Sequence, residues 1–180
     1  MCLLIGPSGV GKTLLLKTLQ TGNYSGSKSF TDSLEDVPST IPTTGTNLVN
    51  ITVHKKQEVT VREVGGSMGP IWPNYYKNAN AIMYMLDLSN RCQVSAACIQ
   101  LLTMLIHPCN AATPILVLLN KKDLSSVTTS TEIKWLLHLE ELKEQATHKI
   151  TILEVSAKTG LGLDQVARWI HDNHRKSVQS

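Results

Sequence analysis

Residues 6–13, GPSGVGKT, combine closely spaced glycines with a lysine and a threonine, directly after a short apolar run. Glycines at this spacing let consecutive backbone N–H groups surround a phosphate, and a helix N-terminus behind them adds partial positive charge. The lysine can reach the outer phosphates, and the threonine hydroxyl can ligate Mg²⁺. A glycine turn with an exposed lysine is the alternative, which the strand-to-helix context disfavours. The residues assigned to phosphate binding in this phosphate loop are Gly9, Val10, Gly11, Lys12 and Thr13.

Two further segments, NKKD at residues 120–123 and SAK at residues 156–158, also follow short apolar runs. The carboxylate of Asp123 can accept two hydrogen bonds from the ring N–H and the exocyclic amine of guanine, whereas adenine offers no such pair of donors. Either segment alone is weak evidence for guanine binding. Asn-Lys-x-Asp in a surface loop is usually a solvated turn, and Ser-Ala-Lys is a weaker signal still. The phosphate loop and these two segments occur in this order, and each follows its own predicted strand. Together the three segments predict a nucleotide pocket. Its guanine side comprises Asn120, Lys121, Asp123, Ser156, Ala157 and Lys158.

Residues 61–69, VREVGGSMG, permit two interpretations. Gly65, Ser67 and Gly69 match the G-x-S-x-G elbow of serine hydrolases. That elbow requires a sharp turn from a central parallel strand into a helix, whereas residues 58–64 are typical of the second arm of a hairpin. In the second interpretation, residues 63–66 are a variant of the Asp-x-x-Gly hinge that senses a terminal phosphate. A hydrolase built on Ser67 would need Asp123 or Asp164, and then His171 or His174.

Hydrophobic periodicity predicts the elements that must position these segments. Apolar runs at residues 1–5, 81–86, 115–119 and 150–155 are typical of strands buried on both faces, and residues 47–53 and 58–64 predict an antiparallel hairpin. Helical patterns lie between the strands, and Thr129 with Glu132 predicts a capping box at the start of one helix. The alternation implies a mostly parallel sheet covered on both faces, with ligands at the carboxyl ends of its strands. Residues 21–40 are polar and lack periodicity, so we expect a long mobile loop there.

The composition excludes several classes of protein. A chain of 180 residues with 42% hydrophobic and 17% charged residues is typical of one globular domain, which we expect over residues 1–180. A net charge of +3 without a block of like charges argues against nucleic-acid binding. The four cysteines include no C-x-x-C pair, which favours free thiols and a cytoplasmic protein. Because no membrane-length apolar run or lipid-anchor motif is present, we expect no lipid anchor, and we also expect a monomer.

With its three segments in this order, the chain resembles a small GTPase of the Ras superfamily over nearly all its length. IPTTGTN at residues 41–47, and VGG followed by WPNYY, are similar to the first and second switches of ADP-ribosylation factors, which places it among the Arf-like proteins. The resemblance implies a three-layer P-loop NTPase fold with a six-stranded, mostly parallel sheet and one antiparallel edge strand. It also implies GTP or GDP and Mg²⁺ as ligands, and protein effectors that bind the switches. In this family Thr43 would ligate Mg²⁺ and Gly66 would contact the γ-phosphate.

The sequence departs from the Arf pattern at two positions that matter for chemistry. Glu63 stands where the family has an aspartate that holds a water on Mg²⁺, and Ser67 stands where a glutamine orients the attacking water. Because this chemistry depends on positioning and electrostatics, we expect GTP binding with slow or negligible hydrolysis. A GTP-bound interaction module without catalysis is the main alternative. An ATP-using enzyme is disfavoured, since adenine would leave Asp123 unpaired.

The surface that Arf effectors recognise also differs. Its aromatic triad corresponds here to Thr46, Arg62 and Tyr75, so a single aromatic residue remains. Arf proteins also carry an amphipathic N-terminal helix, whereas the first strand-like run of this sequence starts at Met1. We therefore expect effectors different from those of Arf proteins.

Overall fold

The computed structural model describes residues 1–22, 40–53, 56–124, 127–146 and 149–175. The mobile loop expected at residues 21–40 lies almost entirely outside these ranges.

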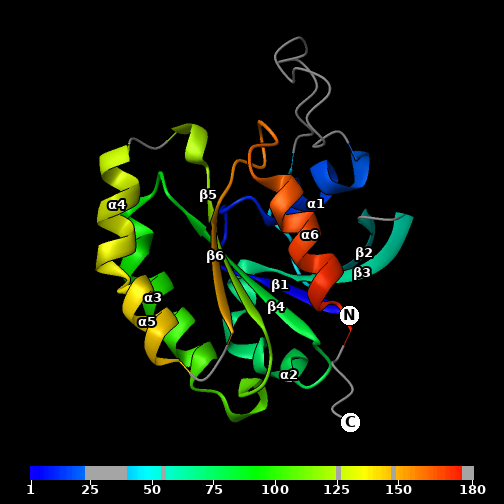
Figure 1. The fold of residues 1–180 in the computed structure, drawn as a ribbon, viewed down its shortest axis with the longest axis horizontal. Helices are drawn as coiled ribbons and strands as arrows, with labels where there is room; N and C mark the ends of the chain where they lie inside the picture. Colours follow the sequence, from blue (N-terminus) through cyan, green and yellow to red (C-terminus); the bar gives the residue numbers. More distant parts are fainter. Residues whose placement is uncertain (23–39, 54–55, 125–126, 147–148, 176–180) are drawn as a thin grey trace.

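A six-stranded sheet forms the centre of the molecule (Figure 1), with the strand order β2-β3-β1-β4-β5-β6. Edge strand β2 pairs antiparallel with β3, and the other neighbouring strands pair parallel. This confirms the expected mostly parallel sheet with one antiparallel edge strand. The strands are β1 (Cys2–Ile5), β2 (Thr46–Val53), β3 (Gln57–Val64), β4 (Ala81–Asp87), β5 (Ile115–Asn120) and β6 (Ile150–Glu154).

Helices cover both faces of the sheet (Figure 1), with α1 and α6 on one face and α3, α4 and α5 on the other. The prediction that Thr129 caps a helix is wrong, because α4 already begins at Val127 and Thr129 lies inside its first turn. The helices are α1 (Lys12–Thr21), α2 (Pro73–Tyr76), α3 (Val94–Leu105), α4 (Val127–Leu136), α5 (Leu139–Gln145) and α6 (Leu163–Asn173).

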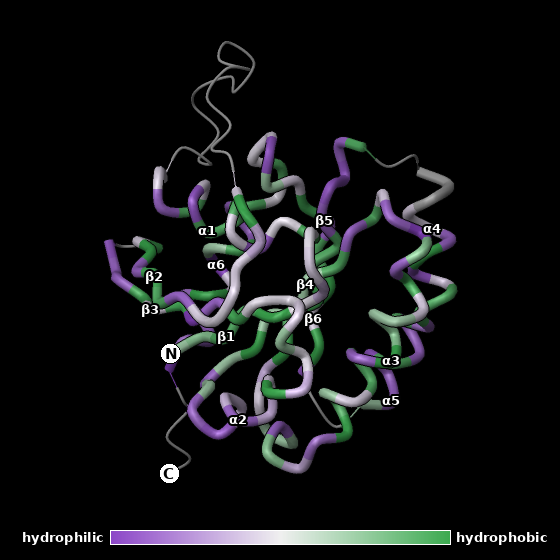
Figure 2. Tube along the Cα trace, turned by 180° about the vertical axis from the view of Figure 1, so that it is seen from behind, coloured by the Kyte–Doolittle hydropathy of each residue, from purple (hydrophilic) through white to green (hydrophobic). Residues whose placement is uncertain are grey.

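Two hydrophobic cores result from the alternation of side chains along the buried strands. In β4, Met83 and Met85 face α1 and α6, whereas Ile82 and Tyr84 face α3. The central strands are accordingly the most hydrophobic part of the chain trace (Figure 2). Both faces of these strands are buried, which explains their continuous apolar runs.

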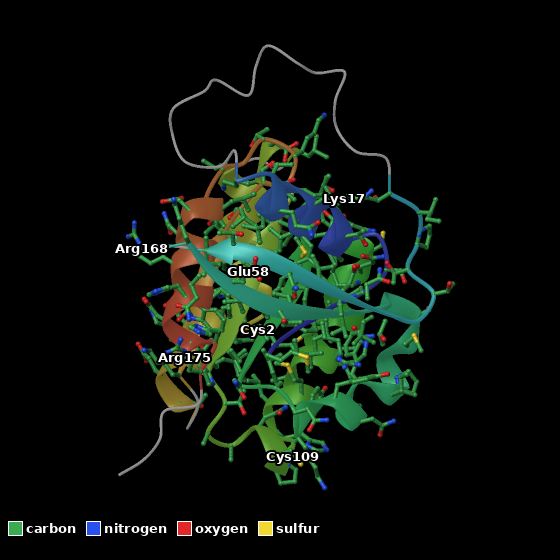
Figure 3. All side chains as sticks on the ribbon, turned by 90° about the vertical axis from the view of Figure 1, so that its right-hand side faces the viewer. Cys2, Lys17, Glu58, Cys109, Arg168 and Arg175 are labelled. Carbon is green, nitrogen blue, oxygen red and sulfur yellow. The ribbon has the colours of Figure 1, made fainter. Side chains whose placement is uncertain are left out.

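The cysteines are free thiols, as the sequence predicted. Figure 3 shows Cys2 within the centre of the molecule and Cys109 near its lower end. Within the described residues, no helix is both long and apolar enough to cross a membrane.

The register of the parallel strands places the ends of the central strands beside one another. Asp87 of β4 pairs with Asn120 of β5, and Leu119 of β5 pairs with Glu154 of β6. Because parallel strands point the same way, the loops that follow β1, β3, β4, β5 and β6 meet at one edge of the sheet. The predicted site residues follow these strands.

Candidate nucleotide-binding site

The phosphate loop connects β1 to α1 and passes close to two other strands. A Cβ atom at Gly6, whose φ is +145°, would lie 2.2 Å from the carbonyl oxygen of Met85. A Cβ atom at Gly11, whose φ is +98°, would lie 2.6 Å from Nδ2 of Asn120. A larger residue would be strained at either position and would collide with a neighbour, so this path requires glycine.

Lys12 folds back over the phosphate loop. Its Nζ donates hydrogen bonds of 2.8 Å to the carbonyl oxygens of Gly6 and Pro7. Burial lowers the pKa of Lys12 to about 8, and the nearby carboxylate of Glu63 partly opposes this shift. The ammonium group is therefore held inside the loop by weak neutral acceptors, which an anion could replace.

Asn120 joins three loops that are distant in the sequence. Its side chain is buried, and Nδ2 donates to the carbonyl oxygen of Val10 at 2.7 Å. Its Oδ1 accepts from the backbone N–H of Ala157 at 2.9 Å. Thr18 of α1 adds a bond of 2.9 Å to the carbonyl oxygen of Ala157. The phosphate loop and the two segments assigned to guanine are thus connected by hydrogen bonds.

Asp123 and Ser156 also lie together. The Ser156 hydroxyl donates to Oδ1 of Asp123 at 2.6 Å and accepts from the N–H of Thr159 at 3.1 Å. Asp123 is exposed, so its carboxylate keeps capacity to accept further hydrogen bonds. Lys158, the last residue assigned to guanine, is exposed.

Lys121 adopts a left-handed backbone with φ of +63°, which is uncommon for a residue with a side chain. Its Nζ lies 2.6 Å from Oδ2 of Asp87, at the end of β4. Asp87 is not among the site residues predicted from the sequence. Its position at the end of an apolar run, level with Asn120, is the signal that could have indicated it.

A second group missed from the sequence surrounds Glu154 at the end of β6. Its carboxylate binds Lys122 at 2.6 Å and Ser130 at 2.8 Å, and it also pairs with Lys134 of α4. Burial alone would raise the pKa of Glu154, but these hydrogen bonds outweigh it and lower the pKa to about 2. This cluster connects α4 to the loop that carries Asp123.

Three side-chain oxygens converge beside the phosphate loop. The Thr13 and Thr43 hydroxyl oxygens are 3.1 Å apart, and Oε1 of Glu63 lies 2.5 Å from the first and 3.3 Å from the second. Glu63 is buried, and its Oε2 has no hydrogen-bond partner within the described part of the chain. A carboxylate with two hydroxyl groups is a donor set suited to a hard cation such as Mg²⁺.

The two segments that resemble switches contact each other and the phosphate loop. The N–H of Gly65 donates to the carbonyl oxygen of Gly45 at 2.9 Å. A Cβ atom at Gly66 would lie 2.2 Å from the backbone nitrogen of Ser8, so the two main chains touch. A cavity of about 130 Å³ opens between these segments and the phosphate loop, and Lys12, Thr13, Thr43, Glu63 and Gly66 are among its lining residues.

The structure keeps Ser67 apart from His174, one of the two histidines that a serine hydrolase built on Ser67 would use. Ser67 is exposed and follows the end of β3, in a 3₁₀ helix at Gly66–Ile71. Nε2 of His174 lies 2.9 Å from Nε2 of Gln57, and Gln57 is the first residue of the same strand. A strand of eight residues spans about 25 Å, so His174 lies far from Ser67.

Comparison with known proteins gives the family. A model of the ADP-ribosylation factor family matches residues 1–174. The chain belongs to this family. Relatives of this Arf-family chain include ADP-ribosylation factor-like protein 16 of Homo sapiens, 42% identical over 97% of this chain and 86% of the relative. ADP-ribosylation factor-like protein 1 of Drosophila melanogaster is 35% identical over 93% of this chain and 85% of the relative. The resemblance predicted from the sequence is thereby confirmed.

Solved structures agree with the fold. The Arl6 BBS3 small GTPase from Trypanosoma brucei, with bound nucleotide analogue GppNp, has a TM-score of 0.77 at 20% identity, covering 98% of this chain and 99% of that one. The mammalian SRP receptor has a TM-score of 0.73 at 18% identity, covering 95% of this chain and 98% of that one. The expected P-loop fold of this Arf-like small GTPase is confirmed.

Proposed function

We propose that this chain is a guanine-nucleotide-binding switch that hydrolyses GTP slowly or negligibly. The observation that supports this most strongly is the pair of hydrogen bonds made by Asn120, to Val10 and to Ala157. These bonds fix the base-recognition segments relative to the phosphate loop, so that one nucleotide can span both.

Phosphate binding is proposed for the loop N–H groups of Gly9, Val10 and Gly11 and for Lys12. The ammonium of Lys12 already lies within the loop, at 2.8 Å from two carbonyl oxygens. A charged phosphate is a stronger acceptor than a neutral carbonyl, so it would take over these hydrogen bonds. Gly66 is proposed to donate its N–H to the terminal phosphate, because its main chain touches the loop at Ser8.

Guanine recognition is proposed for Asp123. The hydroxyl of Ser156 fixes one carboxylate oxygen at 2.6 Å, which orients the group toward a base. Guanine would donate both its ring N–H and its amine to this carboxylate, whereas adenine has no equivalent pair of donors. Lys121, with its ammonium held at 2.6 Å from Asp87, would lay its methylene groups against the base.

Mg²⁺ is proposed to bind at Thr13 and Thr43, with the carboxylate of Glu63 beside them. The donor set is suitable, because Mg²⁺ prefers oxygen ligands, and the buried carboxylate oxygen Oε2 lacks a partner. When bound, the ion would neutralise negative charge on the phosphates. The chain itself contributes the two hydroxyl groups and the carboxylate that hold the ion in place.

Slow hydrolysis is proposed because Ser67 is too short to orient water. Ser67 is exposed at the start of a 3₁₀ helix, and its hydroxyl is attached directly to Cβ, whereas a glutamine carries its amide two carbons further out. A misplacement of about 1 Å can reduce a rate by about a hundredfold, and here the positioning group is missing. The resulting protein would still convert bound GTP to GDP, but only over long periods.

A GTP-bound interaction module without turnover is the second candidate. Its support is that the switch segments contact each other through Gly65 and Gly45, and touch the phosphate loop through Gly66. The partners of either form are proposed to be proteins that bind the switches. Because the guanidinium of Arg62 lies 5.1 Å from the ring centre of Tyr75, partners would meet a cation–π pair where Arf proteins present aromatic residues.

Calorimetric titration with GTP, GDP and ATP tests the proposal. We expect binding of both guanine nucleotides and at least about a hundredfold weaker binding of ATP. Lys12→Ala should weaken binding of GTP and GDP, because it removes a charged contact to phosphate. Equal affinity for ATP and GTP, or unchanged affinity in Lys12→Ala, would contradict the proposal.

The nucleotide released from purified protein by heat denaturation separates the two candidates. GDP in the released fraction supports a switch that hydrolyses or exchanges nucleotide. Mostly GTP supports the interaction module, since cells contain hydrolysing enzymes but this pocket would protect its ligand.

A further inference from the structure

The three oxygens of Thr13, Thr43 and Glu63 form a triangle with edges of 2.5, 3.1 and 3.3 Å. Mg²⁺ binds oxygen at about 2.1 Å in octahedral geometry, so adjacent ligands lie about 3.0 Å apart. The triangle therefore has nearly the dimensions of one face of such an octahedron.

The environment of Glu63 also favours direct contact with a cation. The carboxylate is buried, at 1% exposure, and both hydroxyl groups approach the same oxygen, Oε1. Its second oxygen has no hydrogen-bond partner among the described residues. A buried carboxylate that is incompletely paired is unfavourable, and an adjacent cation compensates the charge of the whole group. Lys12 fills this role only in part: its ammonium is close enough to interact electrostatically with Glu63, but it donates its hydrogen bonds to Gly6 and Pro7.

The reach of the side chain explains the difference from the aspartate of Arf proteins. Glu63 lies near the end of β3, whose backbone is fixed by pairing with Leu4 of β1 and Asn47 of β2. The additional methylene therefore lengthens the reach of the carboxylate without moving the strand, and the carboxylate ends beside the two threonines.

We propose that Glu63 ligates Mg²⁺ directly, in place of a water, so that this chain supplies three protein ligands together with Thr13 and Thr43. The proposal rests on the proposed nucleotide binding and replaces the water-mediated role that the family resemblance implies for residue 63. It assigns a specific consequence to the substitution of glutamate for aspartate, namely one fewer water on the bound metal.

Electron paramagnetic resonance of bound Mn²⁺ in ¹⁷O-enriched water counts the waters on the metal. The sample is the full chain with Mn²⁺ and a non-hydrolysable GTP analogue. Three protein ligands and two phosphate oxygens, one each from the β- and γ-phosphates, leave one of six positions for water. We expect one water in the wild type and two in Glu63→Asp, whose shorter side chain withdraws from the metal.

The matched control is Glu58→Asp, on the same strand β3 but exposed and at its opposite end (Figure 3). It should retain one water. Two waters in the wild type would overturn the proposal, and this result does not depend on whether Glu63→Asp folds. Calorimetry on the same samples measures binding of the analogue separately, so a chain that binds no nucleotide would contradict the proposed function rather than yield a water count.

Discussion

Replacement of Asn120 by alanine tests whether one buried side chain joins the phosphate and guanine halves of the site. The substitution removes a 2.7 Å bond to the carbonyl oxygen of Val10 and a 2.9 Å bond from the N–H of Ala157. Val10 and Ala157 are both buried, so each is left with an unsatisfied polar group. Each such group costs about 1–3 kcal/mol. We expect at least about 2 kcal/mol of this cost to appear as weaker nucleotide binding, which corresponds to about a 30-fold increase in Kd.

The assay is the dissociation rate of a fluorescent GDP analogue, measured by stopped flow after addition of excess GDP. Asn110→Ala is the matched control, because Asn110 is also a buried asparagine and its Nδ2 donates to the carbonyl oxygen of Met104 at 2.8 Å. Both variants should unfold at a lower temperature than the wild type. Only Asn120→Ala should release the nucleotide about 30-fold faster. Dissociation within about threefold of the wild type would contradict this prediction, because it would show that Asn120 stabilises the fold without linking the two halves.

Three further predictions address catalysis, specificity and stability. Ser67→Gln should raise single-turnover GTP hydrolysis by about a hundredfold, because it restores a group that can orient water. Asp123→Asn should reduce GTP affinity by at least about a hundredfold and increase affinity for xanthosine triphosphate, since an amide donor matches the carbonyl of xanthine. Because the folded pKa of Glu154, about 2, lies below its ordinary value of 4.5, its carboxylate stabilises the fold above pH 4.5, and this contribution is lost as the pH falls toward 2. Glu154→Gln should therefore show a flatter pH dependence of the unfolding temperature over that range.

Each of these predictions has an outcome that contradicts it. Unchanged hydrolysis in Ser67→Gln would mean that a group other than residue 67 limits the rate. If Asp123→Asn kept its preference for GTP, the carboxylate would not be the base-recognising group. An unchanged acid-unfolding profile in Glu154→Gln would show that the bonds to Lys122 and Lys134 do not contribute to stability.

Local features of the fold could be predicted because their cause lies within a few residues. The buried strands appear as continuous apolar runs, and the arms of the β2–β3 hairpin appear as alternating patterns. The start of α4 was predicted three residues too late, at Ser130 after an N-cap at Thr129, because a threonine followed three positions later by a glutamate also occurs within a helix.

Contacts between distant residues could not be read in the same way. The ion pair of Lys121 with Asp87 and the cluster around Glu154 depend on the register of β4, β5 and β6. A shift of one residue in that register would place these side chains on opposite faces of the sheet. No pattern within a single segment contains this information.

The role of Glu63 depends both on the local sequence and on contacts between distant residues. The substitutions can be read directly from the amino-acid sequence: a glutamate stands where Arf proteins have an aspartate, and a serine stands at residue 67. Only the folded chain shows where the longer side chain ends: Oε1 of Glu63 lies 2.5 Å from the Thr13 hydroxyl and 3.3 Å from that of Thr43. Because β3 is fixed between β2 and β1, the position of the carboxylate depends on the length and conformation of the side chain rather than on a shift of the strand.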